Sequence, residues 1–208
     1  PGEGMIAVMA AGNLATTQAV VSLLDERSKS QEERAPSLLA VPSMFQAARM
    51  VAEVLREVIE QHADTGQRAD STFNATLILG GQIKGGPHRL FLIYPEGNFI
   101  EAAEDTPFFQ IGETKYGRPI LVRAYEPDMS FEAAMKLLLV SFDSTLKANL
   151  TVGAPFDFHC YDADSLKTGR TGRVASDDAY FQKVSEGWGE ALRDALDMLP
   201  EFTLGPTP

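Results

Sequence analysis

The sequence predicts an α+β fold, a four-layer α/β/β/α sandwich of antiparallel sheets. The elements expected along the 208 residues come in the order strand, two helices, about four strands, helix, strand, helix. Helices are thus grouped instead of alternating with the strands, which argues against a doubly wound parallel sheet. The strands are also nearly continuous apolar runs, which indicates sheets covered on both faces. Helices on the outer faces of two stacked sheets would provide that cover.

The first expected strand, Ile6–Ala11, consists of six apolar residues without polar alternation. This pattern predicts a strand covered on both faces. Gly12 permits positive φ in a tight turn, and Asn13 is a good N-cap for the helix expected from Ala15 to Lys29. Backbone N–H groups at this junction could bind a carbonyl, an anion or an extended peptide. A tight turn without chemistry is the alternative.

The next elements have clear local signals. Ser43 and Gln46 have the spacing of a capping box and precede a broad apolar stripe, so a second helix begins there. Two apolar runs, Phe73–Ile83 and Arg89–Tyr94, flank a Gly-Gly-Pro turn and predict a hairpin or meander. Phe99–Ile111 is expected to be a further extended segment.

The remaining elements are a mixture of strong and weak signals. A short helix is expected within Gly112–Arg123, although Pro119 fits a helix interior badly. A long helix follows an Asp128 or Ser130 cap and is expected over residues 130–148. A strand at Phe156–Tyr161 then precedes a helix that begins near residue 177.

Residues 1–175 are expected to form the main domain. Residues 176–208 are expected to be a C-terminal helix and tail that contact another subunit. Gly187 and Gly189 on either side of Trp188 are costly in a helix interior, unless another backbone or an aromatic ring packs closely there. This favours a subunit contact over simple core packing.

Composition excludes several classes of function. The formal charge of −11 argues against binding nucleic acid or an anionic membrane surface. No apolar run reaches the roughly 18 residues that a membrane span requires. The sequence opens without a secretory leader, and its single cysteine, Cys160, cannot form an internal disulfide. We therefore expect a globular protein of the cytoplasm.

No residue pattern indicates a metal, a cofactor or a serine hydrolase. The three histidines occur without a Gly-x-Ser-x-Gly segment, and the glycine-rich segment Gly80–Gly86 lacks the spacing of a phosphate loop. The acidic residues Glu101, Glu104 and Asp105 are interpreted as solvated surface. We expect no metal and no cofactor.

Three segments together resemble the Anbu family, the bacterial homologues of proteasome β subunits. They are Ala11–Gln18, Phe109–Gly117 and Val140–Thr145. Met9–Asn13 is also similar to the Met-Ala-Gly-Gly-Ala segment of proteasome β subunits. The resemblance covers essentially the whole chain, and it implies the fold of the N-terminal-nucleophile hydrolases.

This resemblance implies a peptidase in a homo-oligomeric ring that acts on peptides or unfolded proteins. In the family, a threonine at the mature N-terminus attacks the carbonyl, and its α-amine or a neighbouring group takes the proton. Backbone amides at Ala11, Gly12 and Asn13 would bind the oxyanion and the substrate backbone, with Ala11 or Gly12 at the oxyanion position. Met9 would line the specificity pocket.

The resemblance also assigns supporting residues. Gly112 aligns with the serine that assists catalysis in proteasome subunits, next to Glu113 and Thr114. Asn149 aligns with an aspartate near the end of the later helix. The family's threonine, aspartate and lysine have no counterpart here: the sequence begins with Pro1, which has no hydroxyl, so we expect them upstream of Pro1.

Three hypotheses follow, and whether the chain acts as an enzyme depends on which is correct. The first is a threonine-type peptidase whose N-terminal strands precede this sequence. The second is a non-catalytic ring subunit that binds or scaffolds peptides. The third is a small-molecule enzyme that uses the amides near Gly12 at an anionic group. Without the first strands the neighbouring strand edge would be exposed, so a protein starting at Pro1 is expected to aggregate or fold poorly.

Overall fold

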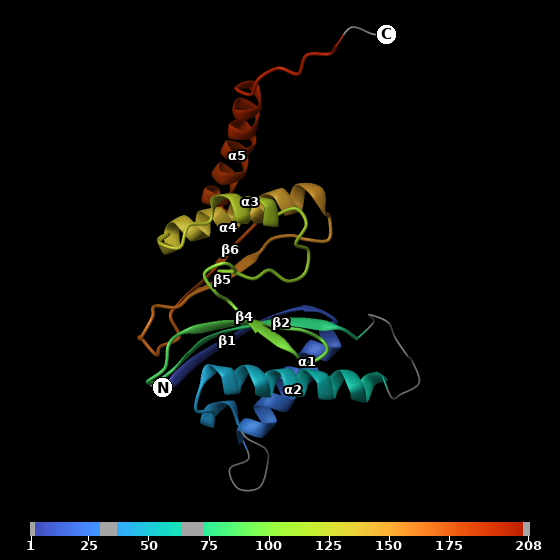
Figure 1. Ribbon diagram of the computed structural model, residues 1–208, viewed down its shortest axis with the longest axis vertical. Coiled ribbons are helices and arrows are strands. Elements are labelled where there is room, and N and C mark those ends of the chain that lie inside the picture. Colours follow the sequence, from blue (N-terminus) through green and yellow to red (C-terminus); the bar gives the residue numbers. More distant parts are fainter. Residues whose placement is uncertain (1–2, 30–36, 64–72, 206–208) are drawn as a thin grey trace. The chain divides into compact units, whose positions relative to one another are not determined.

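The computed structural model describes residues 3–29, 37–63 and 73–205 (Figure 1). Pro1, residues 31–36 of the loop expected before the second helix, and the turn expected at 64–71 lie outside these ranges. The chain forms two compact units. One combines Pro1–Gly112 with His159–Arg170, and the other combines Glu113–Phe158 with Thr171–Pro208.

The first unit is built on a four-stranded antiparallel sheet. Its strands follow the order β1-β2-β3-β4 and comprise β1 (Gly4–Gly12), β2 (Ala75–Ile83), β3 (Arg89–Ile93) and β4 (Phe99–Glu101). The helices of this unit are α1 (Leu14–Lys29), the 3-10 turn η1 (Leu38–Ala40) and α2 (Met44–Ala63). The strands and helices expected in this half of the chain are confirmed, except that strand structure after Phe99 ends at Glu101.

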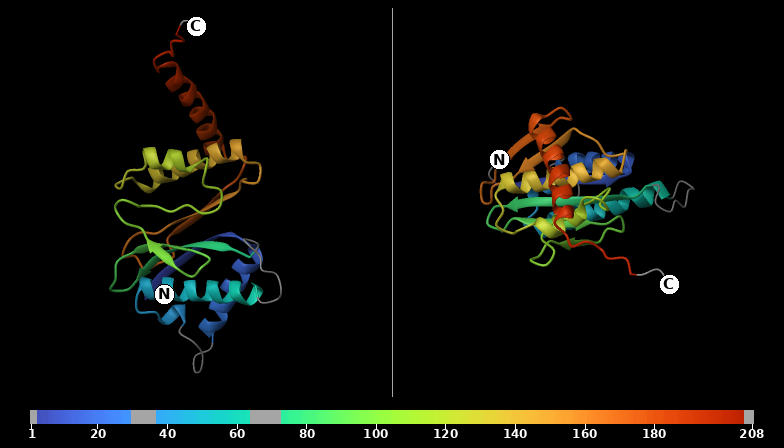
Figure 2. Two further views of the ribbon diagram at one scale, coloured as in Figure 1. Left: turned by 45° about the vertical axis from the view of Figure 1, so that its right-hand side comes forward. Right: turned by 90° about the horizontal axis from the view of Figure 1, so that it is seen from above.

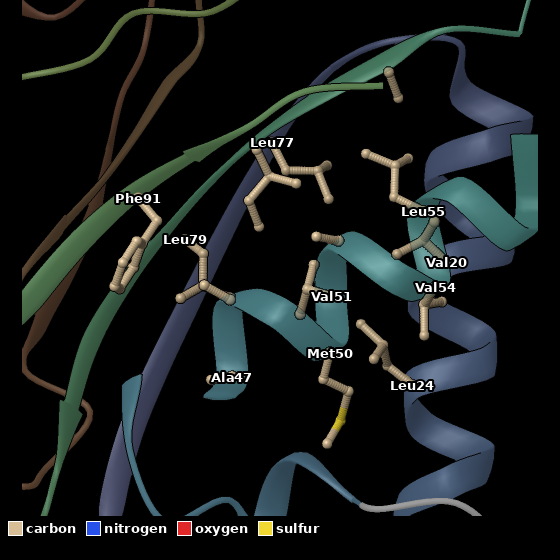
Figure 3. Close-up of a cluster of buried hydrophobic side chains, with 14 of the residues drawn as sticks. Val20, Leu24, Ala47, Met50, Val51, Val54, Leu55, Leu77, Leu79 and Phe91 are labelled. Atoms are coloured by element: carbon tan, nitrogen blue, oxygen red, sulfur yellow. The ribbon is translucent and has the colours of Figure 1, made fainter. Parts of the chain in front are cut away.

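The core of the first unit lies between the helices and the sheet (Figure 3). Leu77 and Leu79 alternate along β2, and their register partners on β3 are Ile93 and Phe91. All four side chains are buried against apolar residues of α1 and α2. Such alternation is what a strand requires when one face packs on helices.

Strand β1 differs from its prediction. Val8 is 40% exposed and Met9 is 60% exposed, so the expected cover on both faces is wrong for this part of the strand. Within the described residues β1 is an edge strand whose only strand neighbour is β2. An apolar run predicts a strand, but it does not specify whether the same unit supplies the cover.

The second unit contains three helices and most of a hairpin. The helices are α3 (Arg118–Ala124), α4 (Phe131–Ala148) and α5 (Ala179–Asp197). The hairpin consists of the paired strands β5 (Phe156–Cys160) and β6 (Arg170–Val174). Each long helix begins at a side-chain cap. Ser130 Oγ accepts from Ala133 N at 3.2 Å, and Asp178 Oδ1 accepts from Phe181 N at 2.9 Å.

The short helix α3 begins later than its prediction. It starts at Arg118, so Pro119 lies in its first turn, where a backbone N–H has no partner within the helix. Pro119 is unfavourable in the interior of a helix, but at this position it favours the start of α3. The expected start at Gly112 is six residues too early, which is about 1.7 turns of helix.

Aromatic rings form the small core of the second unit. The Phe156 ring centroid lies 4.6 Å from that of Phe142 and 5.3 Å from that of Phe181, which connects the hairpin to α4 and α5. Beyond this core α5 extends away from α4 (Figure 2), and Leu192 and Leu196 are 50% and 68% exposed. The end of α5 therefore presents apolar side chains to its surroundings.

The α+β class with antiparallel sheets is confirmed. In each unit helices pack on antiparallel strands, as the layers of the expected sandwich require. None of the helices in the described part of the chain is long and apolar enough to cross a bilayer.

Candidate functional site

The junction between β1 and α1 is fixed by hydrogen bonds from Asn13 and the residues after it. Thr16 N donates to Asn13 Oδ1 at 3.0 Å, which confirms the predicted N-cap. The backbone N–H of Asn13 donates to the carbonyl of Asn74 at 2.9 Å, and Thr16 Oγ1 donates to the carbonyl of Phe73 at 2.9 Å. The junction is thus held against the residues that lead into β2.

Gly12 is required by the geometry of this junction. Its φ is +111°, and a Cβ atom there would lie 2.4 Å from the carbonyl oxygen of Asn74. Real Cβ atoms do not approach a backbone oxygen so closely, and side chains disfavour this φ. The end of β1 is therefore a rigid backbone corner.

The chain returns to this corner about one hundred residues later. A Cβ atom on Gly112, whose φ is +78°, would lie 3.5 Å from the Cβ of Ala11. Ala11, Gly12, Asn13 and Gly112 therefore gather at one end of β1. Met9 lies on the same strand, two residues before Ala11, with its side chain largely exposed.

The other predicted residues form a second group, within the second unit. Asn149 Nδ2 donates to Glu113 Oε2 at 2.9 Å, joining residues 36 positions apart. Glu113 Oε1 accepts from the backbone N–H of Lys115 at 3.4 Å. The carbonyl of Thr114 accepts from Arg118 N at 3.2 Å and so belongs to the start of α3. Each oxygen of the Glu113 carboxylate therefore has a donor.

Thr151 completes this group, and sequence reasoning did not single it out. Its backbone N–H and its hydroxyl both donate to Asn149 Oδ1, at 2.9 Å and 2.7 Å. The Asn-Leu-Thr segment that resembles a glycosylation signal is in fact an Asx turn. The turn orients the Asn149 amide so that its nitrogen faces Glu113.

Among the residues that the structure describes, no three His, Cys, Asp or Glu side chains gather closely enough to hold a metal ion.

Comparisons with known proteins agree on one family. Residues 3–157 match the family of proteasome subunits. Among solved structures, Anbu (ancestral beta-subunit) from Yersinia bercovieri is 48% identical, with a TM-score of 0.88, and the alignment covers 98% of this chain and 84% of that one. Anbu from Hyphomicrobium sp. strain MC1 gives the same four values.

A further structure, the helical assembly of the Anbu complex from Pseudomonas aeruginosa, is 45% identical with a TM-score of 0.89. That alignment covers 98% of this chain and 83% of the other. The search of curated proteins found no match. The likeness to the solved structures extends past residue 157 and so includes α5.

Proposed function

This chain belongs to the Anbu family of proteasome β-subunit homologues, and we propose that it is a subunit of an oligomeric threonine-type peptidase. The reaction is hydrolysis of peptide amides, and the substrates are peptides or unfolded proteins. We place the nucleophilic threonine, and the aspartate and lysine that assist it, on residues that precede Pro1. No cofactor or metal is required, and the proposed location is the cytoplasm.

The observation that supports this proposal most strongly is the rigid backbone corner at the end of β1, where Gly12 and Gly112 come close together. An extended peptide can bind exposed main-chain groups at the end of a strand, while pockets beside the strand select its side chains. Met9, 60% exposed on this strand, would line a specificity pocket.

The hydrogen bonds at the corner narrow the choice of oxyanion donors. The N–H of Asn13 donates to Asn74, so it is not available to a substrate. Hydrogen-bonded and non-hydrogen-bonded pairs alternate in this antiparallel register, so the Ala11 N–H points at Thr76 and the Gly12 N–H points away from β2. We therefore assign the oxyanion to the amide of Gly12, and to Asn13 the task of holding the corner in place. Donors fixed before the reaction stabilise developing charge without reorganisation. Glu113 and Thr114 follow Gly112 in the chain, and Asn149 donates a hydrogen bond to Glu113. These three residues have a supporting role in this proposal.

We also propose a homo-oligomeric ring, with residues 176–208 as a subunit contact. Large apolar side chains at the end of α5 and in the tail are 50% to 87% exposed, and they are Leu192, Leu196, Met198, Leu199, Phe202 and Leu204. So many large exposed apolar side chains within one short segment favour an interface. A relative in this family forms a helical assembly.

Intact mass measurement of the natural gene product tests the peptidase. The complete protein is incubated with a peptide electrophile that reacts with an N-terminal threonine, and hydrolysis of a fluorogenic peptide amide is followed in parallel. We expect one adduct per subunit and loss of hydrolysis. A natural product without adduct or hydrolysis would favour the non-catalytic peptide-binding subunit instead.

The Met9→Ala variant tests the position of the substrate. Because Met9 is exposed, its truncation should leave stability unchanged but alter the ratio of kcat/KM between peptides with large and small residues before the cleaved bond. Val21→Ala, at a 57% exposed apolar residue of α1, is the matched control and should leave the ratio unchanged.

A further inference from the structure

A groove of about 570 Å³ lies between α4 and α5. Asp143 and Lys147 line it from α4, and Trp188, Glu190 and Arg193 line it from α5. All of its lining residues belong to the second unit, so the groove does not depend on the placement of the first.

Two polar groups in the groove have no partner. Asp143 is only 5% exposed, yet no ion pair or hydrogen bond connects its carboxylate to a residue that the structure describes, Lys147 and Arg193 included. The indole Nε1 of Trp188 is buried and likewise without an acceptor in the described chain. Burying an N–H without an acceptor is unfavourable, and a carboxylate in a largely buried residue binds a charged donor strongly. The groove therefore offers an unpaired donor at Trp188 Nε1 and an acidic acceptor at Asp143.

The same unit has cations without partners. Lys115, Arg118 and Arg123 line a separate hollow around α3, together with Thr114, Pro119 and Val122. None of the three makes an ion pair with a described residue, and no acidic side chain lines this hollow. Val122 beside them is 63% exposed. The formal charge of the whole chain is −11, so a surface that carries three cations and an exposed apolar side chain is unusual for this protein.

We propose that the α4–α5 groove of one copy receives the α3 surface of a second copy. An arginine of α3 fits both unsatisfied groups: its guanidinium donates to the Asp143 carboxylate and stacks on the indole of Trp188. A backbone carbonyl of the same segment accepts from Trp188 Nε1. Glu186 and Glu190 add negative charge at the rim of the groove.

The two surfaces share no residue, so each copy can offer its groove to one neighbour and its α3 to another. A contact of that type repeats from copy to copy and produces a closed ring or an open helix, depending on the rotation. This inference deepens the proposed subunit contact by naming its partner surface, and it stands whether or not the chain hydrolyses peptides.

Reciprocal charge reversal in the complete gene product tests the contact. An α3 variant carries Arg118→Glu and Arg123→Glu, and a groove variant carries Glu186→Lys and Glu190→Lys. Each variant alone places like charges opposite one another, so its self-association constant should fall at least about tenfold. A one-to-one mixture restores opposite charges at every contact, and it should recover most of the association seen by sedimentation and light scattering.

Trp188 provides an independent signal, because it is the only tryptophan in the sequence and lies in the groove. Its emission should change with protein concentration over the range in which the natural protein assembles. The change should be lost in each variant alone and return in the mixture. An emission that does not depend on concentration would show that the groove is not filled by a second copy.

The matched control carries Lys136→Glu and Lys167→Glu, two exposed lysines that line neither surface. It has the same change of net charge as the α3 variant and should assemble like the natural protein. Circular dichroism melts at low concentration establish that all variants fold. Folded variants that assemble normally alone, or fail to recover when mixed, would overturn the proposal. A natural protein that assembles normally but does not hydrolyse peptides would contradict the proposed function. It would not contradict the contact proposed here.

Discussion

A Cβ atom on Gly117 would lie 2.2 Å from the Oγ of Ser141 and 3.0 Å from its carbonyl oxygen. The segment before α3 therefore rests directly on α4, with only a hydrogen where other residues carry a side chain. Glu113 and Thr114 lie at the start of this segment. The contact thus helps to position two of the residues proposed to support the reaction.

We expect Gly117→Ala to lower the free energy of unfolding by about 2–3 kcal/mol, since the added methyl group has no space. Adding Ser141→Ala should recover part of this loss, because it removes the closest atom. Gly153→Ala is the control, as a Cβ atom there meets no heavy atom within 4 Å. Urea denaturation measures all three. Equal effects of Gly117→Ala and Gly153→Ala would contradict the close packing.

Asn149→Asp is expected to make stability depend on pH. The new carboxylate would take the place of an amide whose nitrogen lies 2.9 Å from Glu113 Oε2. Two carboxylates that close repel one another, which raises the pKa of the pair in the folded state. An acid with a raised folded pKa destabilises the fold once the pH exceeds its unfolded value near 4, and the full penalty is reached above the folded pKa.

Thermal melts of the natural protein and the variant between pH 4 and pH 8 measure this effect. The two curves should nearly coincide at pH 4 and separate by about 1–2 kcal/mol at pH 7. Thr151→Val is the control: it removes one donor to Asn149 without adding charge, so its effect should not vary with pH. A constant difference for Asn149→Asp would exclude the Glu113–Asn149 contact.

Local chemistry made much of the fold predictable. Asn13 is predicted as a cap, and Ser130 as one of two candidates with Asp128, because short polar side chains before an apolar run satisfy the first amides of a helix. The strands of the first sheet and the two longest helices of the chain were recognisable from their apolar patterns. These signals are contained within a few residues, so tertiary context does not alter them.

Contacts between distant residues were not predictable in this way. Glu113 and Asn149 entered the candidate site through a family resemblance, and no spacing rule predicts that their side chains meet. The exposure of Met9 was not predicted either. An apolar run indicates that something packs on a strand, but it does not indicate which part of the molecule does so. The misplaced start of α3 came from treating Pro119 as an interior residue when it belongs to the first turn.

The ion pair between Arg89 and Glu101 predicts a second pH effect. The hydrogen bond from Arg89 lowers the pKa of the Glu101 carboxyl. A lowered folded pKa contributes stability above the unfolded value near 4.3, and this contribution is lost as the pH falls through the folded pKa. The side chains are 28% and 38% exposed, so solvent screening limits the contribution to less than about 1 kcal/mol.

Glu101→Gln should accordingly be less stable than the natural protein at pH 7 and equal to it near pH 3, as measured by chemical denaturation. Arg89 also lies over the ring of the buried Phe91, 5.0 Å from its centroid, and this contact remains in the variant. Glu104→Gln, at an exposed acid without an ion pair to a described residue, should show no such convergence. Parallel pH profiles for the two variants would contradict the assignment.

Gln82 holds the loop between β5 and β6 against the first sheet. It is 3% exposed, and its Nε2 donates to the carbonyl of Gly86 at 2.8 Å and to Asp164 Oδ1 at 2.7 Å. Its Oε1 accepts from the hydroxyl of Tyr161 and the N–H of Asp164, both at 2.8 Å. Asp164 has a φ of 63°, unfavourable for a residue with a side chain, so this loop conformation depends on its hydrogen bonds.

Gln82→Leu should therefore destabilise the fold by about 2–3 kcal/mol, because it removes four partly buried hydrogen bonds at once. Tyr161→Phe removes a single hydroxyl from the same network and should cost only about 1 kcal/mol. Limited proteolysis provides the local measurement: cleavage within residues 161–169 should accelerate strongly in Gln82→Leu and slightly in Tyr161→Phe. Equal cleavage in the two variants would show that the loop is held by something other than the carboxamide of Gln82.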